Sequence, residues 1–358
     1  MIDYIDVSIG NKIIKESIMK RVSKIIDSGQ YIMGESLNQF ETDFAKYCEC
    51  KYAIGLNSGT DALRFALMAL CDGEGDVLTV SHTFPATVMS ILSVGANPIF
   101  VDVDKHGTMD VDDLKRKISN KTKAIIPVHF MGHMSRMDKI IEIANGIPVI
   151  EDACQSVGAT LAGKKAGSFG DIGCFSFFPT KNLSCCGDGG AIVTSRIDLY
   201  DKIISLRNFG RTERDTFLEF GLNSRLDEIQ ASILCEKMNY IDEWLNSRRI
   251  IAKSYYDALK DTVEFIKPYD DCESSFHIFS IRVNDNNAFV KKMEEKGVDC
   301  RTHYTIPVHK QPFVTTDTIL PMTDIISKEN VSLPMSEFLS QTDQNLIINN
   351  IKEIVNAS

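Results

Sequence analysis

Short apolar runs rich in valine and isoleucine alternate with segments of helical periodicity between about residues 50 and 195. The expected strands cover residues 52–56, 77–80, 98–101, 124–128, 148–150, 172–177 and 191–194. Helical stretches lie between several of them, such as residues 61–70, where apolar side chains share one face. Strands that are apolar throughout and separated by helices favour a mostly parallel sheet covered on both faces. The pattern therefore predicts an α/β layer.

The pattern changes in the last third of the chain. The expected elements there are a long, interrupted or bent helix over residues 226–259, a strand over 276–283, and helices over 286–296 and 344–355. This order of elements predicts a smaller α+β domain. We therefore expect a large domain over residues 1–250, which includes the N-terminal segment, and a small C-terminal domain over residues 251–358.

Composition and charge narrow the class of protein. The chain of 358 residues is 44% hydrophobic and 25% charged, as expected for a globular protein with room for a large core. Its net charge of -10 argues against a nucleic-acid partner, because phosphate backbones bind clustered lysines and arginines. Neither an apolar run of about 18 residues nor a signal-peptide pattern occurs. We expect a cytoplasmic protein that does not bind membranes, although a local pocket can still bind an anion.

Ten cysteines are dilute in a chain of this length, and the spacing Cys-x-x-Cys is absent. Cys48 and Cys50 are one residue apart, and Cys185 and Cys186 are adjacent. Neither spacing suits a tetrahedral zinc site, so we expect reduced thiols and no metal. The sequence assigns Cys185 and Cys186 no role beyond filling space.

Candidate chemistry is sought where polar residues end the apolar runs, because open α/β sheets bind ligands at the carboxyl ends of their strands. The segment Asn57-Ser-Gly-Thr-Asp-Ala-Leu63 leads from a strand through a glycine turn into a helix. Gly59 permits close approach of a phosphate, and the Thr60 hydroxyl adds a donor at the positive end of the helix dipole. A simple N-cap formed by Ser58 or Thr60 is an equally good interpretation.

Three further strand ends carry polar or aromatic candidates. Asp152 follows Glu151 at the end of a buried strand, where a carboxylate needs a partner such as a protonated ring nitrogen, or a capping role. Ser176 is suited to bind a phosphate, or is only a small strand residue. Phe84 is suited to lie flat on a planar ligand, or belongs to the core.

Lys181 stands between the aromatic run that starts at Cys174 and a glycine-rich turn. Lysine is normally solvated, so an amine at an apolar strand end needs a chemical reason. A desolvated lysine has a lowered pKa and can form an imine with an aldehyde. An acid such as Asp152, at a different strand end, can keep a pyridine ring protonated and electron-withdrawing. Together with the phosphate seat and the aromatic face, these groups predict pyridoxal 5'-phosphate (PLP) as cofactor.

The same residues resemble the DegT/DnrJ/EryC1/StrS sugar aminotransferases, PLP enzymes with the fold of aspartate aminotransferase (fold type I). The resemblance covers nearly the whole chain, through motifs at residues 31–34, 40–41, 57–63, 151–158, 176–183, 187–190, 223–231 and 303–309. It implies a large α/β domain, with a mostly parallel sheet between helices, and a small α+β domain.

The resemblance also implies the cofactor contacts. Lys181 would hold PLP as an imine and then carry a proton between the substrate carbon and the cofactor, while Asp152 would pair with the pyridine nitrogen. The remaining contacts would be Gln155 to the ring hydroxyl, Phe84 on the ring face, and Gly59, Thr60 and Ser176 to the phosphate. Asn223 would reach the phosphate of a neighbouring subunit, so that a homodimer would share its active sites.

The reaction implied is transfer of an amino group from L-glutamate to a keto group of a nucleotide-linked sugar, in a polysaccharide or O-antigen pathway. The substrate contacts implied are Tyr31, Asn182, Arg225, Tyr304 and His309. A packing role is an equally good interpretation of His309. The motifs at 223–228 and 303–309 favour a dTDP-linked 3-keto-6-deoxyhexose over a 4-keto sugar, and the nucleotide could also be UDP or GDP.

Other classes remain as alternatives. A related branch of the family replaces the lysine with histidine and removes a hydroxyl group from the sugar, and the presence of Lys181 argues against that branch. A PLP-dependent sugar dehydratase or lyase is therefore a weaker hypothesis than an aminotransferase. A cofactor-binding regulator without turnover is weaker still, because Lys181, Asp152 and Gln155 are all present.

Overall fold

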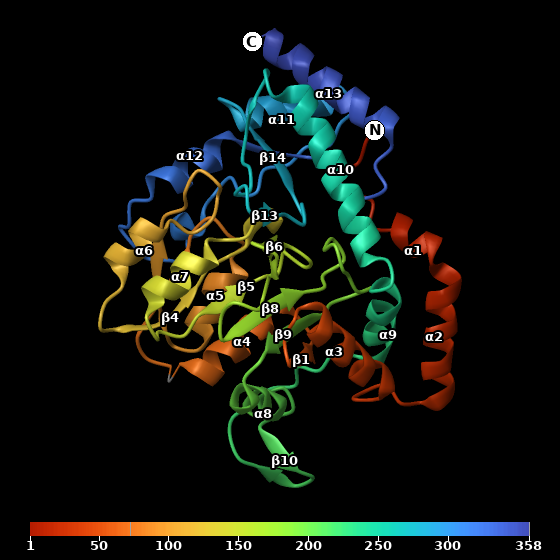
Figure 1. Cartoon of the computed structure of the whole chain (residues 1–358), viewed down its shortest axis with the longest axis vertical. Coiled ribbons are helices and arrows are strands. Elements are labelled where there is room, and N and C mark those ends of the chain that lie inside the picture. The colour runs from red at the N-terminus through yellow and green to blue at the C-terminus, as the bar shows by residue number, and fades with distance from the viewer. Residues whose placement is uncertain (72, 358) are drawn as a thin grey trace.

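The computed structural model describes residues 1–71 and 73–357, and a broad central sheet is its main feature (Figure 1). The strands of this sheet are β1 (Tyr52–Leu56), β2 (Asp76–Val80), β3 (Asn97–Val101), β4 (Thr122–Ile126), β5 (Ile150–Asp152), β8 (Ile172–Ser176) and β9 (Gly190–Thr194). They pair as β1-β9-β8-β5 and β3-β2-β4. Parallel bridges from Ile125 to Val149 and from Val128 to Asp152 join the two groups side by side. The pairs β2–β3, β2–β4 and β5–β8 are parallel, which confirms the predicted, mostly parallel sheet.

Strand β9 is the exception, because it runs antiparallel to both β1 and β8. A loop over residues 177–189, without a helix, joins β8 to β9. Parallel neighbours are usually connected by a crossover helix. Because this connection has none, β9 starts at the edge of the sheet where β8 ends and runs in the opposite direction. This direct return leaves Lys181 at the carboxyl edge of the sheet, in the loop itself.

Both faces of the sheet are covered, as the apolar strands predicted. Along β8, Ile172 and Cys174 enter one apolar cluster while Phe175 enters another. The helices that contribute to the first cluster are α4 (Gly59–Leu70), α5 (Ala86–Ser93) and α8 (Ile197–Leu206). The helices of the second are α3 (Glu35–Tyr47), α6 (Val111–Lys117), α7 (Met137–Ala144) and α9 (Glu228–Lys237). The alternation along the strands therefore builds two cores, one on each face.

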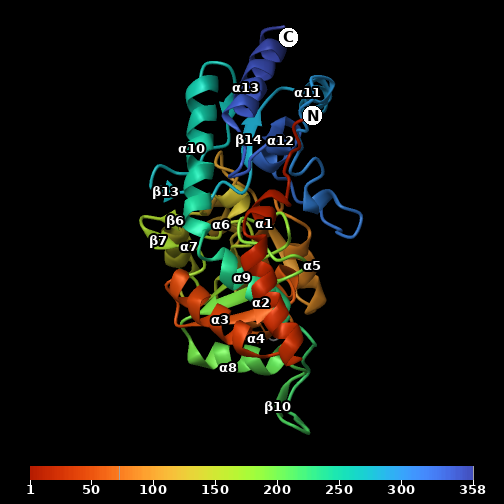
Figure 2. The same cartoon turned by 90° about the vertical axis from the view of Figure 1, so that its right-hand side faces the viewer.

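The helix predicted over residues 226–259 is interrupted, as expected. It consists of α9 and α10 (Ile241–Leu259), with a turn between them. Near the chain start, α1 (Ile9–Ile13) precedes α2 (Lys15–Ser28), which packs along α9. Helix α10 then leads from the large layer to the small part of the molecule (Figure 1, Figure 2).

The small part is α+β, as predicted. It contains the antiparallel strands β12 (Glu264–Phe265), β14 (Phe279–Arg282) and β15 (Asn330–Leu333), with helices α11 (Asn286–Glu295), α12 (Pro321–Glu329) and α13 (Gln341–Asn356). Strand β14 begins later than predicted because Phe276 has φ +43°, which interrupts an extended chain. Ile251 packs in the core of this part, while Leu245 of the same helix packs in the large layer. The division at residues 250 and 251 stays a prediction.

Several short elements complete the chain. Strands β6 (Thr160–Leu161) and β7 (Lys164–Lys165) pair with β13 (Cys272–Glu273), and single helical turns cover Phe130–Gly132 and Val308–Lys310. Strands β10 (Arg211–Glu213) and β11 (Thr216–Phe217) form a hairpin that projects beyond α8 in both views (Figure 1, Figure 2). Within the described ranges, none of the helices is both long and apolar enough to cross a bilayer.

Candidate active site at the carboxyl edge of the sheet

A pocket of about 340 Å³ lies where several strands of the large layer end. It brings together most of the residues predicted for the cofactor, together with one predicted substrate contact. The predicted residues that line it are Gly59, Thr60, Phe84, Asp152, Gln155, Ser176, Lys181 and Tyr304. These residues are far apart in the sequence and meet because the carboxyl ends of parallel strands share one edge of the sheet.

Lys181 enters the pocket from the loop that follows β8. The backbone N–H of Lys181 donates a 2.8 Å hydrogen bond to the carbonyl of Phe178, which closes a tight turn, and the residue lines the pocket. Burial lowers the pKa of the Lys181 amine, and the nearby Cys154 and Asp152 partly oppose this effect. The pocket therefore holds an amine that loses its proton more easily than a solvated lysine does.

Asp152 faces the pocket from the end of β5. Its Oδ2 accepts a 2.8 Å hydrogen bond from the hydroxyl of Thr87, and its Oδ1 accepts a 3.2 Å bond from the backbone N–H of Cys154. The adjacent Glu151 points to the opposite face and is fully buried. Two adjacent acids on one strand therefore have separate environments, because successive side chains alternate across a sheet.

Glu151 has a structural role. Its carboxylate accepts hydrogen bonds from the backbone N–H groups of Gly167, Phe169 and Gly170 at 2.7–2.9 Å, and it lies 2.8 Å from His129 Nε2. These partners satisfy a buried carboxylate that would otherwise be costly. Of the two acids predicted at this strand end, only Asp152 is placed to meet a ligand.

The glycine turn at the start of α4 forms an N-cap and also lines the pocket, so both of its interpretations apply. The Ser58 hydroxyl caps the helix by accepting a 3.1 Å bond from the N–H of Asp61, so the N-cap interpretation is correct for Ser58. Thr60 lines the pocket instead. A Cβ atom at Gly59 would lie 2.7 Å from Cβ of Ser176 and 2.8 Å from Sγ of Cys154. Only glycine fits there, and the helix N-terminus stays open to an anion.

Gln155, Tyr304 and Phe84 shape the rest of the pocket. The side-chain oxygen of Gln155 accepts a 2.8 Å bond from the backbone N–H of Met131, which fixes the orientation of its amide. Burial raises the pKa of the Tyr304 hydroxyl, which also interacts with Gln155. The ring centroids of Tyr304 and Phe84 are 6.1 Å apart, and Phe84 is 56% exposed. The core alternative for Phe84 is therefore wrong, and its ring lies at the pocket mouth.

Two predicted substrate contacts, Asn182 and His309, do not line this pocket. The Asn182 amide nitrogen donates a 2.8 Å bond to the carbonyl of Ser275, and the side chain is buried. His309 is buried, with Nδ1 2.6 Å from the Ser81 hydroxyl and Nε2 3.7 Å from Asp324. These bonds are those of a packing histidine, which favours the structural interpretation of His309.

Three further predicted residues are absent from the lining of the pocket. Asn223 is exposed and pairs with Asn208, whose side chain also accepts a 3.0 Å bond from Arg225. Tyr31 is half exposed, and its carbonyl accepts a 3.0 Å bond from the N–H of Glu228. Their roles stay predictions.

Sequence reasoning missed several residues of the pocket. The lining also includes Thr83, Thr87, Cys154, Asp188, His277 and His303. His303 belongs to the motif at residues 303–309, but the resemblance implies no role for its side chain. His277 belongs to the stretch predicted as a strand, where no pattern marks it. The signal was weak because these residues come from different segments that only the fold brings together.

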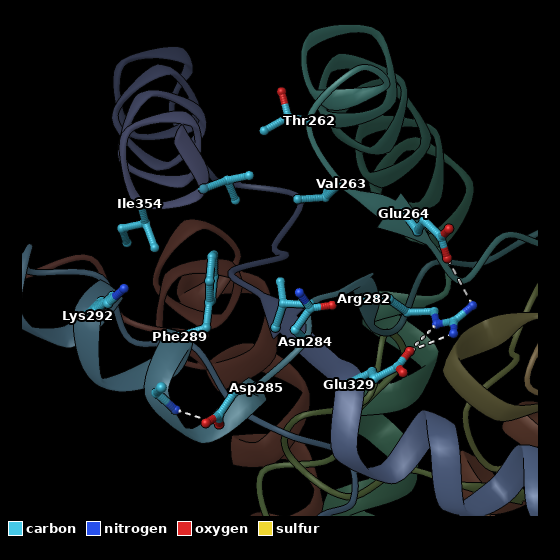
Figure 3. A pocket seen from close by; sticks show the side chains of 13 residues that line it. Thr262, Val263, Glu264, Arg282, Asn284, Asp285, Phe289, Lys292, Glu329 and Ile354 are labelled. Carbon is cyan, nitrogen blue, oxygen red and sulfur yellow. Dashed lines mark hydrogen bonds and ion pairs between the residues drawn. The ribbon is translucent and has the colours of Figure 1, made fainter. Parts of the chain in front are cut away.

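A larger pocket of about 580 Å³ lies in the small part, between the ends of α10, α11 and α13 (Figure 3). Arg282 in this pocket forms ion pairs with Glu264 at 3.1 Å and Glu329 at 2.5 Å. The Arg282 guanidinium is already paired with two carboxylates, so this group stabilises the fold and is not a free cation for a ligand. We therefore take the pocket of Lys181 as the candidate active site.

The adjacent cysteines Cys185 and Cys186 lie in the loop after Lys181. Cys185 is buried in the apolar core, and Cys186 is exposed, with its backbone N–H bonded to Gln230 at 2.9 Å. This placement supports the space-filling interpretation for Cys185. Among the described residues, no group of three or more histidine, cysteine, aspartate or glutamate side chains could hold a metal ion.

Comparisons with known proteins point to one family. A family model described as the DegT/DnrJ/EryC1/StrS aminotransferase family matches residues 12–352. The "dTDP-3-amino-3,6-dideoxy-alpha-D-galactopyranose transaminase" of Aneurinibacillus thermoaerophilus is 37% identical over 356 residues, covering 97% of this chain and 98% of the relative.

Solved structures agree with this match. Streptomyces venezuelae DesV, in complex with a ketimine intermediate, aligns with a TM-score of 0.95 at 32% identity over 98% of each chain. The ntda protein of Bacillus subtilis, with bound cofactor PMP, aligns with a TM-score of 0.90 at 31% identity, covering 95% of this chain and 82% of that one. The predicted aspartate-aminotransferase-like fold is confirmed.

Proposed function

The chain belongs to the DegT/DnrJ/EryC1/StrS aminotransferase family, and we propose that it transfers the amino group of L-glutamate to a nucleotide-linked keto sugar. Glutamate would leave as 2-oxoglutarate, and the amino group would replace the keto oxygen of the sugar. The observation that carries the proposal is the position of Lys181, a buried amine of lowered pKa that lines the same pocket as Asp152.

The cofactor of the family is pyridoxal 5'-phosphate, and the residues of this pocket fit it. A side chain at Gly59 would collide with Ser176 and Cys154, so the backbone at the start of α4 lines the pocket directly, and Thr60 and Ser176 supply hydroxyl donors beside it. Asp152 is held by Thr87 as an acceptor for a ring N–H. When bound, the cofactor supplies an aldehyde that reacts with amines and a ring that withdraws electrons from the substrate carbon.

Lys181 would supply both the attachment point and the proton carrier. Burial lowers the pKa of its amine, so a larger fraction of it is neutral near pH 7 than for a solvated lysine. A neutral Nζ can accept the proton of the substrate carbon and return it to a neighbouring atom. The turn that bonds Lys181 N–H to Phe178 keeps this amine at the sheet edge.

The other side chains of the pocket would orient the reactants. Asp152 would hold the ring nitrogen, and Gln155, whose amide Met131 fixes, would face the ring hydroxyl. The ring of Phe84 at the mouth would cover the ring face, and Tyr304 beside it would limit the entry of water.

We further propose that two copies of the chain share their active sites. Asn223 does not line the pocket of its own chain, and it follows a hairpin that projects from the molecule (Figure 1). Phe217, Leu218 and Phe220 on this segment are 59–72% exposed. Large apolar side chains gathered in this way are typical of an association surface. Association through this surface would allow Asn223 to reach the phosphate of the partner's cofactor.

The substrate proposed is a dTDP-linked 3-keto-6-deoxyhexose. Support comes from the printed name of the Aneurinibacillus relative, a transaminase named for a dTDP-3-amino sugar. This relative does not favour the alternative, a 4-keto sugar. The cytoplasmic location and a role in polysaccharide or O-antigen biosynthesis stay predictions of the sequence.

A panel of dTDP-, UDP- and GDP-linked keto sugars tests this function. Each sugar is incubated with the holoenzyme and L-glutamate, and the aminated carbon is identified by NMR. We expect nitrogen at C3 of the dTDP sugar and an equal amount of 2-oxoglutarate. A 4-amino product would overturn the choice of sugar, and the absence of 2-oxoglutarate with every substrate would overturn the aminotransferase.

A further inference from the structure

His277 lines the pocket of Lys181 but has no role in the proposed cofactor binding or proton transfer. Its Nδ1 is buried, and within the described residues it has no hydrogen-bond partner. Buried polar atoms are almost always hydrogen-bonded in folded proteins, because an unpaired one loses its water without compensation. A nitrogen left unpaired in a ligand pocket therefore points to a partner that arrives with the ligand.

The backbone before His277 has an uncommon conformation. Phe276 has φ +43°, a left-handed value that bulky side chains rarely adopt. Its N–H donates a 3.0 Å bond to the Ser274 hydroxyl, and its carbonyl accepts a 3.1 Å bond from Arg248. Such a conformation costs free energy and persists only where the surroundings impose it, most often at functional sites.

The large layer holds the same segment in place. The Ser275 hydroxyl donates a 3.2 Å bond to the carbonyl of Gln155, and the Ser275 carbonyl accepts a 2.8 Å bond from the Asn182 amide. Gln155 lines the pocket, and Asn182 directly follows Lys181 in the chain. The position of the His277 ring is therefore tied to the position of the Lys181 amine.

The charge of the ring suits a hydrogen bond and not an ion pair. Burial lowers the pKa of His277 well below its usual value, and repulsion from Lys181, Arg248 and His303 lowers it further. A neutral imidazole can donate one hydrogen bond without adding a positive charge beside the Lys181 amine.

His277 belongs to the small part of the molecule, just before β14. The residues proposed for the cofactor within one chain all belong to the large layer, from Gly59 to Lys181. A pocket whose two walls come from different parts can hold the cofactor on one wall and the reactant on the other. The wall that carries His277 is the one with no cofactor contact proposed.

We propose that His277 is a substrate-binding residue of this pocket, and that its Nδ1 donates a hydrogen bond to an oxygen atom of the molecule that reacts at Lys181. The inference rests on the proposed aminotransferase function. The oxygen belongs either to a carboxylate of the amino donor or to the sugar, and the two half-reactions distinguish these sources.

The test compares three substitutions at this position in the holoenzyme. His277→Phe keeps a ring but removes both nitrogens, His277→Asn places an amide near the position of Nδ1, and His277→Gln places it near Nε2. Stopped-flow absorbance follows the cofactor during reaction with L-glutamate alone, and then follows the amino form of the enzyme with a dTDP-linked 3-keto-6-deoxyhexose. Cofactor affinity and the unfolding temperature are measured for each variant.

We expect His277→Phe and His277→Gln to slow one half-reaction roughly ten- to hundredfold, while His277→Asn recovers most of the rate. Cofactor affinity should stay within about twofold in all three. A loss with glutamate assigns the oxygen to the donor, and a loss with the sugar assigns it to the acceptor.

The matched control is His133→Phe. His133 contacts the same Phe276 ring from a buried position outside the pocket, with both nitrogens already bonded, to Ser274 at 2.8 Å and to the Ile266 carbonyl at 3.3 Å. We expect this variant to unfold at a lower temperature and to react at the parent rate once loaded with cofactor.

Three results would overturn the inference: parent rates in both half-reactions for His277→Phe, equal losses for Asn and Phe, or a loss of cofactor affinity that parallels the loss of rate. Each would apply only if the parent enzyme reacts with glutamate. A parent enzyme that reacts with no amino donor would instead overturn the proposed function.

Discussion

The hydroxyl of Thr87 donates a 2.8 Å hydrogen bond to Oδ2 of Asp152, from the first turn of α5 to the end of β5. The residues are far apart in sequence and meet because β2 and β5 both end at the edge of the sheet that forms the pocket. The backbone N–H of Cys154 donates to the other oxygen, Oδ1, so two bonds hold the carboxylate in a side chain that lines the pocket. The acid is therefore oriented before any ligand binds.

Replacing Thr87 tests this orientation. Thr87→Val has the same shape but lacks the donor, so the carboxylate of Asp152 can turn away from the ring nitrogen. We expect cofactor affinity and turnover to fall about tenfold or more, because bonds to charged groups contribute about 1.5–3 kcal/mol. Fluorescence titration with PLP measures the affinity. Thr87→Ser is the control and should stay near the parent value, and equal affinity for Val and Ser would show that the bond is not needed.

Glu228 is a buried carboxylate whose role is stability. It is 2% exposed and accepts bonds from the N–H groups of Gly34, Ser36 and Leu37 at 2.7, 2.9 and 3.0 Å, so it caps α3 from α9. Glu228→Ala leaves these donors without a partner, and we expect the free energy of unfolding to fall by about 2–4 kcal/mol. Urea unfolding measures the change.

The control for Glu228 is on the same helix. Glu236 pairs with Arg21 at 2.8 Å, but the Arg21 side chain is 40% exposed. The exposed Arg21 can turn to water when its partner is removed, so Glu236→Ala leaves no buried donor unpaired and should lower the free energy of unfolding less than Glu228→Ala. Equal effects of the two substitutions would contradict the capping role of Glu228.

Buried histidines predict a loss of stability in mild acid. Burial lowers the pKa of His82 and of His133 to about 4, from an ordinary value near 6.5. Below pH 6.5 these histidines bind protons in the unfolded chain but stay neutral in the folded chain. The free energy of unfolding therefore falls as the pH drops from about 6.5 to 4. His133→Asn removes one such group, and the slope should decrease by about 1.4 kcal/mol per pH unit near pH 5. Unfolding curves between pH 5 and 7 measure this slope, and an unchanged slope would show that His133 protonates in the folded state.

Subunit mixing tests the proposed sharing of active sites. Lys181→Ala and Asn223→Ala would each inactivate an enzyme in which Asn223 acts across the interface. A mixed dimer would then hold one intact site, made of Lys181 from one subunit and Asn223 from the other. We expect a random mixture to recover about a quarter of the parent turnover. If the mixture stays as inactive as the separate variants although mixed dimers form, Asn223 acts within its own chain, and a fully active Asn223→Ala variant would show that Asn223 has no role.

The sequence was sufficient to predict the layered fold and the meeting of Lys181 and Asp152, because both depend on apolar runs and on the polar residues at the strand ends. The direction of β9 could not be predicted, since a strand with both faces buried has the same pattern whether it runs parallel or antiparallel. The separate environments of Glu151 and Asp152 also could not be predicted from the sequence, because the register of the strand decides which face of the sheet each side chain lies on.

His309 and His277 show the limit for single residues. His309 stands in a motif of the family, yet its bonds to Ser81 and its contact with Asp324 are those of a packing residue. His277 stands in no recognised pattern, yet the left-handed Phe276 before it brings it into the pocket lining. The backbone conformation of Phe276 decides both where β14 starts and where this ring lies, and this conformation cannot be predicted from the periodicity of the sequence.

Borohydride reduction of the PLP-loaded enzyme, combined with peptide mass spectrometry, is the decisive experiment for the role of Lys181. Reduction makes the link between cofactor and lysine permanent, and Lys237 provides an internal comparison. Burial also lowers the pKa of Lys237, but its amine is bonded to the carbonyl of Ser184 at 2.7 Å and lies outside the pocket. We expect the added mass on the peptide that contains Lys181 and its loss in Lys181→Ala. Added mass on Lys237 or another lysine of the parent enzyme, with Lys181 unmodified, would contradict the proposed site.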